Sequence, residues 1–312
     1  MRIDLLERVS ELRARRTPFV VATVVRVAKP ASAHPGDSAI VLPDGTLEGF
    51  VGGMCSESTV RTQGLRQLAA GRSVLLHITP SADSVVAPAG SDGGAHLENE
   101  VTVGNPCLSG GSLDIFLEVM RPPALIHVYG DTPVAWALAD VGHAAGADVR
   151  PTTDAGAPVP ADATAVVVAS QGGDEHRVLK AALDAGVPYI GLVASRRRGA
   201  AVLQSLGLDE EERARVHTPA GLDIGAQSPG EVAVSIMAEV IALAAKAQTP
   251  QTHATHQPHH DHAEATDPVC GMTVAITEAA IRLEAQDGVV YFCCPNCRDA
   301  FAADPGRYTR TL

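Results

Sequence analysis

The sequence has few aromatic residues, few basic residues and no long uninterrupted hydrophobic segment. Aromatic side chains make up only 3% of the 312 residues, so Ala, Val, Leu and Ile must supply most of the core. The 36 acidic residues outnumber the 24 basic ones, and the net charge of -12 argues against a nucleic-acid or anionic-membrane partner. No apolar run approaches the roughly 20 residues of a membrane span, and the N-terminus does not have the pattern of a signal peptide.

Cysteine is also scarce. Six unevenly spaced cysteines do not form a secreted disulfide framework, so a reducing cytoplasm is the expected location.

The cysteines fall into two groups. Cys55 and Cys107 each lie in a glycine-rich segment of a long body that is otherwise free of cysteine. The other four lie near the C-terminus: Cys270, Cys293, Cys294 and Cys297. Both Cys294-x-x-Cys297 and Cys293-x-x-x-Cys297 are spacings that let two sulfurs face one ion. Thiolate ligands suit zinc or copper(I), so we predict a metal site here, with purely structural cysteines as the alternative.

The predicted elements indicate an α/β protein with a mixed α+β N-terminal domain over residues 1–121. Helices are expected at the N-terminus, around Leu5 and Leu12, and over residues 57–70. Strands are expected over residues 19–25, 38–42, 47–50, 73–78 and 113–120. The Gly-, Ser- and Asp-rich segment 80–106 predicts a loop.

Residues 122–247 alternate between short apolar segments and helical patterns, which predicts a Rossmann-like, doubly wound parallel sheet. The expected strands are 125–129, 148–152, 165–169, 189–192 and 216–217, and the expected helices are 133–145, 175–185 and 197–206. A capping box, Ser228-Pro229-Gly230-Glu231, predicts the start of a further helix.

Two segments complete the chain. Residues 248–266 contain five histidines and few apolar residues, and we interpret them as a linker. Residues 267–312 form a small cysteine-rich module. A hydrophobic core alone seldom stabilises so short a segment, so a bound metal is the expected support.

Cys55 lies where a predicted strand ends and a helix begins, directly after Gly52, Gly53 and Met54. A helix N-terminus stabilises a thiolate and lowers the pKa of the thiol, and glycines let a ligand approach the backbone. The alternative is a buried cysteine in a tight turn. Cys107 precedes Gly110 and Gly111, so the two loops are candidates for one shared site.

The Rossmann-like domain contains two candidate phosphate-binding segments. Gly130 follows the first strand, but it is the only glycine of the G-x-G-x-x-G pattern present, and Asp131 would repel a pyrophosphate. Ser195, Arg196 and Arg197 follow a later strand at the same predicted edge. Guanidinium groups at a helix N-terminus can bind a phosphate or pterin phosphate, whereas the alternative is a solvated charged turn.

The body of the chain, residues 1–246, resembles the XdhC/CoxI family. The resemblance rests on Pro35-Gly36 with Val51-Gly52-Gly53-Met54-Cys55-Ser56-Glu57, and on Tyr189-Ile190-Gly191-Leu192-Val193-Ala194-Ser195-Arg196-Arg197-Arg198. It is completed by Gly221 to Glu231 and the predicted helix over residues 236–241. The tail, with Asp267-Pro268-Val269-Cys270-Gly271-Met272, Cys293 and Cys297, is similar to a YHS domain, a metal-associated module.

The resemblance implies a chaperone that binds molybdenum cofactor (molybdopterin), supports its sulfuration and delivers it to a molybdenum hydroxylase. Such a client is a xanthine dehydrogenase or an aerobic carbon monoxide dehydrogenase, a cysteine desulfurase is an expected partner, and a homodimer is an expected assembly. Cys55 is then the first candidate to contact the molybdenum or its transferable sulfur, and Cys107 the second. Two alternatives remain: an NAD(P)-dependent oxidoreductase, and a copper or zinc handler that acts through the C-terminal module.

Overall fold

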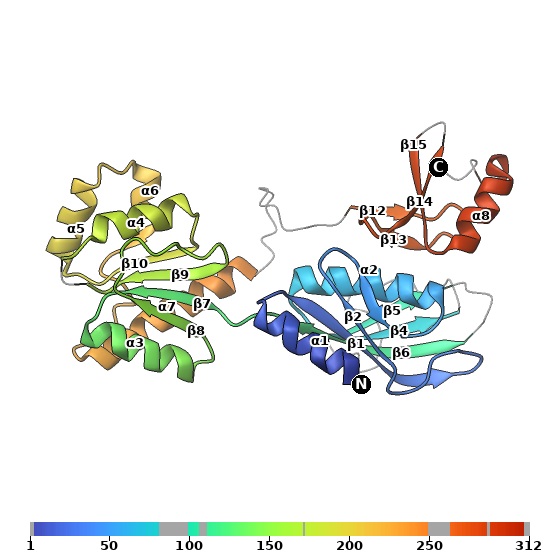
Figure 1. Cartoon of the computed structure of the whole chain (residues 1–312), viewed down its shortest axis with the longest axis horizontal. Coiled ribbons are helices and arrows are strands. Elements are labelled where there is room, and N and C mark those ends of the chain that lie inside the picture. The colour runs from blue at the N-terminus through green and yellow to red at the C-terminus, as the bar shows by residue number, and fades with distance from the viewer. Residues whose placement is uncertain are drawn as a thin grey trace, which may run out of the picture. The chain divides into compact units, whose positions relative to one another are not determined.

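The computed structural model describes residues 3–80, 99–105, 111–170, 172–248, 263–285 and 288–308. The chain divides into two compact units: residues 1–122 together with 254–312, and residues 123–253 (Figure 1). The C-terminal module therefore belongs to the same unit as the N-terminal domain, although the second unit separates them in sequence. Across the described ranges, no helix has the length and apolar character that crossing a membrane requires.

A six-stranded sheet forms the centre of the first unit. Its strands are β1 (Phe19–Ala28), β2 (Ser38–Val41), β3 (Leu47–Gly49), β4 (Val74–Thr79), β5 (Glu100–Gly104) and β6 (Ser112–Met120), in the order β3-β2-β1-β6-β4-β5. All neighbours are antiparallel except β4 and β5. The strand β5 corrects the prediction of a loop over residues 80–106. Its segment Val101-Thr102-Val103 favours a strand, but only pairing with β4 selects that conformation.

Two helices cover opposite faces of this sheet. α1 (Ile3–Ala14) places Leu5 and Leu12 against Phe19 and Val21 of β1. α2 (Met54–Ala70) packs on the other face, where the alternate residues of β1 point. α2 begins three residues before the predicted helix, so Cys55 lies inside its first turn. It ends at Gly71, whose φ of 68° is left-handed.

The C-terminal module contains two hairpins and a helix. β12 (Glu264–Thr266) pairs with β13 (Thr273–Ala275), β14 (Ile281–Ala285) pairs with β15 (Gly288–Phe292), and α8 (Pro295–Ala303) follows, with a 3-10 turn over Pro305–Arg307. Residues 264–266, assigned above to the linker, thus form a strand. The module packs on α2, where the amide of Ala275 donates to Thr62 Oγ1 at 3.2 Å. The short apolar core of the module includes Phe292 and Phe301.

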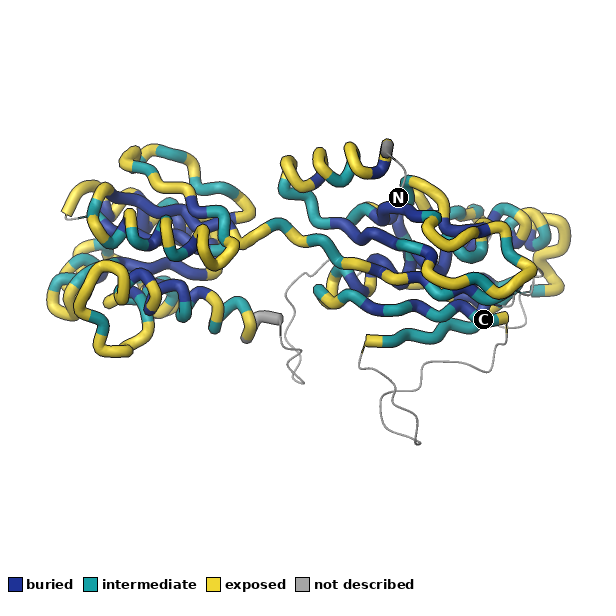
Figure 2. Tube along the Cα trace, turned by 90° about the horizontal axis from the view of Figure 1, so that it is seen from below, coloured by how far each residue is buried: buried dark blue, intermediate teal, exposed yellow. Residues whose placement is uncertain are grey.

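The second unit is a doubly wound parallel sheet, as the sequence predicts. Its strands are β7 (Leu125–Tyr129), β8 (Asp148–Thr152), β9 (Ala163–Val168), β10 (Tyr189–Leu192) and β11 (Val216–His217), in the order β11-β10-β9-β7-β8. Figure 2 shows these strands as a largely buried layer between more exposed helices. The chain reverses its direction of travel across the sheet between β7 and β9. The carboxyl ends of these two strands are where such folds bind ligands.

Helices cover both faces of this sheet. α3 (Pro133–Ala144) and α7 (Pro229–Gln248) contribute to one apolar cluster, and α4 (Glu175–Asp184) and α5 (Arg196–Ser205) contribute to the other. The predicted capping box forms at the start of α7, because Ser228 Oγ accepts from the Glu231 amide at 3.3 Å and Glu231 accepts from the Ser228 amide at 2.9 Å. The short helix α6 (Glu210–Ala214) was not predicted. It is held by its own capping box between Asp209 and Glu212.

Candidate functional site

Cys55 is the second residue of α2, in the first unit. Gly53 is the N-cap, with extended backbone angles of φ -71° and ψ 171°. The Glu57 amide donates to the Gly53 carbonyl at 3.1 Å, so the amides of Met54, Cys55 and Ser56 precede the regular helical hydrogen bonds. These N–H groups and the helix dipole favour an anionic group beside Cys55.

A cavity of about 480 Å³ opens beside this helix start. Its volume lies within the roughly 300–1,000 Å³ typical of small-molecule and cofactor sites. Gly52 has a φ of +125°, which side-chain-bearing residues rarely adopt. A Cβ added to Gly53 would have no heavy atom within 4 Å, so this glycine leaves its backbone open to a ligand. The lining comes from several segments: Pro30, Ala31, Ser32, Ala33, Gly52, Gly53, Met54, Cys55, Ser56, Gly111, Leu113, Cys294 and Asn296.

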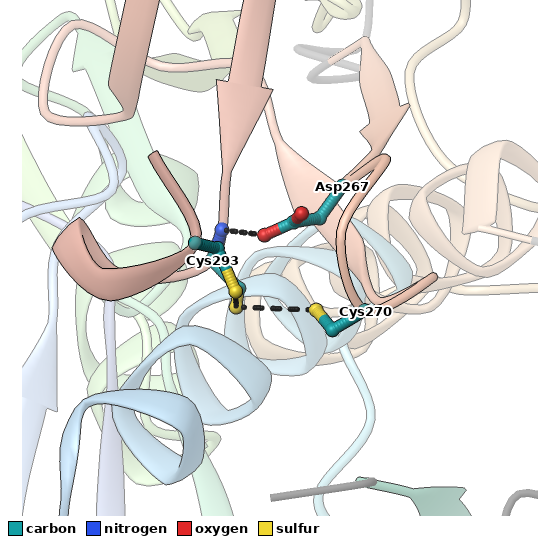
Figure 3. Close-up of side chains that lie close together, drawn as sticks. Asp267, Cys270 and Cys293 are labelled. Atoms are coloured by element: carbon teal, nitrogen blue, oxygen red, sulfur yellow. Dashed lines mark hydrogen bonds between the residues drawn. The ribbon is translucent and has the colours of Figure 1, made fainter. Parts of the chain in front are cut away.

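The cysteines of the C-terminal module gather around Asp267. The sulfur of Cys293 lies 3.5 Å from that of Cys270 and 3.7 Å from that of Cys297. Asp267 is fully buried, and one of its carboxylate oxygens accepts from the amide of Val269 at 2.9 Å. The other oxygen accepts from the amide of Cys293 at 2.8 Å (Figure 3). One ligand atom from each of the four residues lies within 4.8 Å of the others. Sulfur ligands 2.3 Å from a tetrahedral ion lie about 3.8 Å apart, so this donor set fits a single metal ion.

The thiols of this cluster differ in their tendency to ionise. The hydrogen bond with Cys293 lowers the pKa of Cys270. The pKa of Cys293 is strongly raised, first by its hydrogen bond with Cys270 and then by its hydrogen bond with Cys55. Burial, followed by the negative charge of Cys270, raises the pKa of Cys297. Of Cys270, Cys293 and Cys297, Cys270 is therefore the thiol whose ionisation the cluster favours most.

The structure brings Cys55 together with the C-terminal cysteines. The sulfurs of Cys55, Cys293 and Cys294 all lie within 4.8 Å of one another. Cys55 packs against the apolar core of the module, and Cys294 is the N-cap of α8 and lines the same cavity as Cys55. Sequence reasoning treated the two cysteine groups as separate sites, because no local pattern indicates that they meet.

Cys107 lies outside the described residues. The later part of its glycine-rich segment is described, and Gly111 lines the cavity beside Cys55. A Cβ at Gly111 would lie 2.0 Å from the Pro30 carbonyl oxygen, so only glycine allows these two loops to pack together. Gly111 thus belongs to the wall of the Cys55 cavity.

In the second unit, Gly130 lines a cavity of about 340 Å³ at the carboxyl ends of β7, β8 and β9. A Cβ at Gly130 would lie 2.4 Å from the Ala169 carbonyl oxygen, so this glycine allows the strand ends to pack. Asp131 also lines the cavity and accepts from Trp136 Nε1 at 2.7 Å. The Thr132 hydroxyl caps α3 and donates to the Ala169 carbonyl at 2.7 Å. The features that shape this crevice are therefore explained by packing and capping.

Ser195, Arg196 and Arg197 lie together at the start of α5, away from the lining of the Gly130 cavity. Ser195 Oγ accepts from the Arg198 amide at 3.3 Å and caps the helix. Arg196 forms an exposed ion pair with Asp223 at 3.1 Å and lines a different cavity, together with Arg213. Arg197 is exposed.

Among the ion pairs of the described residues, that of Arg198 has the most buried carboxylate. Its guanidinium binds Glu175, a carboxylate only 4% exposed that also accepts from Ser170 Oγ at 2.9 Å and the Gly172 amide at 3.2 Å. This network holds the loop after β9 against α5. In the sequence, Arg198 is one of three consecutive arginines that predict a phosphate site, and nothing local marks Glu175 as its partner. A buried acid at the first position of a helix has no local sequence signal.

Comparisons with known proteins match both units. Residues 12–79 match the XdhC and CoxI family, and residues 126–240 match the XdhC Rossmann domain. The chain is 27% identical over 269 residues to the uncharacterized protein YqeB of Escherichia coli K12, an alignment that covers 77% of this chain and 46% of that protein. The chain thus spans about half the length of this curated relative.

Among solved structures, similarity is found to a xanthine dehydrogenase (BH1974) from Bacillus halodurans. The two chains are 15% identical, the match covers 80% of this chain and 97% of the other, and the TM-score is 0.38. Each of the two family matches lies within a single unit, and both end before the C-terminal module begins.

Proposed function

The chain belongs to the XdhC and CoxI family, and on this premise we propose that it is a maturation factor for a molybdenum hydroxylase. In this role it binds molybdenum cofactor, supports the cofactor's sulfuration, and passes it to a client such as a xanthine dehydrogenase or a carbon monoxide dehydrogenase. The cofactor is the cargo of such a protein. A cysteine desulfurase is the proposed source of sulfur.

The observation that carries this proposal is the cavity beside Cys55. A thiolate is a soft ligand suited to a metal or a transferable sulfur atom. The first amides of α2, which precede the regular helical hydrogen bonds, favour an anionic group, and molybdopterin carries a phosphate. The open backbone at Gly53 allows a flat ring system to approach closely. Three properties of one cavity thus suit an anionic metal-bearing pterin.

In this proposal, the residues around the cavity have different roles in binding the cofactor. Cys55 contacts the metal end of the cargo, and the first amides of α2 orient its anionic groups. Gly52 holds the turn that presents these amides, because its positive φ is accessible mainly to glycine. None of these roles requires a reaction with turnover, which favours a chaperone over an enzyme.

The test is to coexpress the full chain with molybdate supply and to measure the pterin released when the purified protein is denatured. We expect wild-type protein to carry molybdopterin and Cys55→Ser to carry at least about tenfold less, equivalent to about 1.4 kcal/mol of binding free energy. The matched control is Cys297→Ser, which changes a cysteine that does not line the cavity. It should retain the pterin.

Activation of the client provides an independent readout. Purified client enzyme produced together with wild-type chain should be active, and client produced with Cys55→Ser should not. If the wild-type chain releases no pterin and client activity does not depend on the chain, the proposed function is wrong.

A metal-handling role of the C-terminal module is the second candidate. Its support is the set Asp267, Cys270, Cys293 and Cys297, whose ligand atoms lie within 4.8 Å of one another. Three sulfurs and one oxygen suit zinc, whereas copper(I) would favour the sulfurs alone. Elemental analysis of the full chain purified under reducing conditions tests this role. A stoichiometric metal that is lost in Cys270→Ser would support it.

The oxidoreductase alternative has less support. Gly130 is explained by its close approach to Ala169, and the acidic Asp131 lines the crevice that a pyrophosphate would occupy. Calorimetric titration of the full chain with NADH and NADPH should detect no micromolar binding. Clear binding would restore this alternative.

A further inference from the structure

Three cysteines from two separate parts of the chain form a compact thiol cluster. Cys55 comes from the start of α2, and Cys293 and Cys294 come from the junction between β15 and α8. Their three sulfurs lie within 4.8 Å of one another. Cys293 and Cys294 are 3% and 5% exposed, and Cys55 is half-buried, so the cluster is largely shielded from water.

Both helices of the cluster present their N-termini to one cavity. Cys55 follows the N-cap of α2, Cys294 is itself the N-cap of α8, and both line the 480 Å³ cavity. Two helix N-termini favour negative charge at the same place, and the charge that this cluster can develop is that of its thiolates. A complex of one monovalent ion with several thiolates keeps a net negative charge, which the two helix N-termini would stabilise.

This cluster differs in chemistry from the set around Asp267. The Asp267 set contains three sulfurs and a carboxylate oxygen, which amounts to four donors. The Cys55 set contains only sulfur and has three donors among the described residues. Cys293 belongs to both sets, and a thiolate has enough lone pairs to bridge two ions.

We propose that Cys55, Cys293 and Cys294 form a site of their own for a soft monovalent ion, copper(I), held between the N-terminal domain and the C-terminal module. Zinc in closed protein sites takes four ligands, whereas copper(I) is selected by thiolate ligands and accepts three. Three sulfurs 2.3 Å from a trigonal ion lie about 4 Å apart, which the observed limit of 4.8 Å accommodates. No electron transfer is involved, since the ion arrives as copper(I) and the thiols release their protons on binding.

The site has a consequence for the architecture of the first unit. An ion bound by Cys55 on one side and by Cys293 and Cys294 on the other crosslinks the module to the glycine turn. Arg66 of α2 binds Glu264 of β12 and Thr62 of α2 binds the Ala275 amide, so these contacts dock the module before the ion arrives. The ligands are thus brought together by packing that does not depend on metal.

The test is an anaerobic titration of the reduced full chain with copper(I), in competition with a chromophoric copper(I) chelator. The protein is prepared without molybdate, so the result does not depend on the proposed cofactor. We expect Cys55→Ser and Cys294→Ser each to lower the affinity for one equivalent of copper(I) by at least about tenfold. Cys297→Ser, which alters only the Asp267 set, should leave that equivalent in place. X-ray absorption of the protein with one equivalent bound should report three sulfur neighbours.

A further variant removes no sulfur at all. Arg66→Glu loosens the docking of the module and leaves every cysteine intact. It should lower the affinity for the same equivalent of copper(I). Thermal unfolding of each variant, followed by circular dichroism, identifies any change that merely unfolds the first unit. If Cys55→Ser and Cys294→Ser are both folded and bind copper(I) with the number and affinity of wild type, the proposal is overturned. Loss of the equivalent in Cys297→Ser alone would equally overturn it, because the ion would then belong to the Asp267 set.

Discussion

Arg66 of α2 binds both carboxylate oxygens of Glu264 of β12, through Nε at 2.6 Å and Nη2 at 2.5 Å. The two residues are 198 positions apart, and the residues of the second unit lie between them in the sequence. Forked pairing of this kind sets orientation as well as distance. The ion pair therefore fixes how the hairpin of β12 and β13 lies along the helix that begins at Cys55.

Arg66→Ala should loosen the module without unfolding it. Arg66 and Glu264 are 41% and 33% exposed, so water screens the pair and its contribution is about 1 kcal/mol or less. We expect faster hydrogen exchange in β12 and β13 and faster alkylation of Cys55, each by up to about fivefold. Arg72→Ala, at an exposed arginine just beyond α2, is the control. Equal exchange rates in Arg66→Ala and wild type would contradict the docking role.

The two neighbouring glycines before α2 should respond differently to alanine. Gly52→Ala should destabilise the first unit by about 1–3 kcal/mol, because its φ of +125° strains any residue with a Cβ. Gly53→Ala should cost less than about 1 kcal/mol, because its φ is -71° and its Cβ would meet no atom within 4 Å. Denaturant unfolding measures both. Gly53→Ala should still reduce pterin retention, since its methyl group would enter the cavity.

The adjacent arginines of α5 provide a matched pair for the second unit. Arg198→Ala leaves the buried carboxylate of Glu175 without its cation, and we expect a loss on the order of 3 kcal/mol. Arg196→Ala should change stability by less than about 0.5 kcal/mol, because Arg196 and Asp223 are 83% and 82% exposed. Chemical denaturation followed by a probe in the second unit compares them. Equal losses would show that Glu175 does not depend on Arg198.

His127 of β7 should make the stability of the second unit depend on pH. Burial, and then the positive charge of Arg150, lower the pKa of His127 below its ordinary value of 6.5. Between the folded and unfolded pKa values the unfolded chain binds more protons, so stability is full above about pH 6.5 and falls as the pH decreases below it.

His127→Leu should therefore flatten the decline of unfolding free energy between about pH 7 and pH 5. His143→Leu, at an exposed histidine of α3, should leave the slope unchanged. Identical slopes in wild type and His127→Leu would mean that another group controls this pH dependence.

Local patterns predicted most elements of the second unit. Short runs of buried β-branched residues, such as Val166 to Val168, alternate with helices, and this order requires a parallel sheet. The capping box at Ser228 marked the start of α7 within one residue. β5 escaped prediction, because a five-residue segment becomes a strand only when a neighbour such as β4 supplies its hydrogen bonds.

The candidate site, too, has features that the local sequence predicted and features that depend on tertiary contacts. The sequence predicted that Cys55 follows a glycine turn at a helix start and that the four C-terminal cysteines are close enough to share a metal ion. Both predictions were possible because backbone conformation and short spacings are local properties. The choice of Arg198 over Arg196 and Arg197 as the partner of a buried acid depended on Glu175, which lies on another helix.

By itself, then, the amino-acid sequence determined most of the elements, the parallel sheet and the candidate residues for binding a metal or an anion. Only the tertiary structure decided that Cys55 lies against Cys293 and Cys294. The physical reason is that a contact between distant residues arises from the packing of whole surfaces, here the module against α2 through Thr62 and Arg66. No short-range propensity of the chain encodes such a contact.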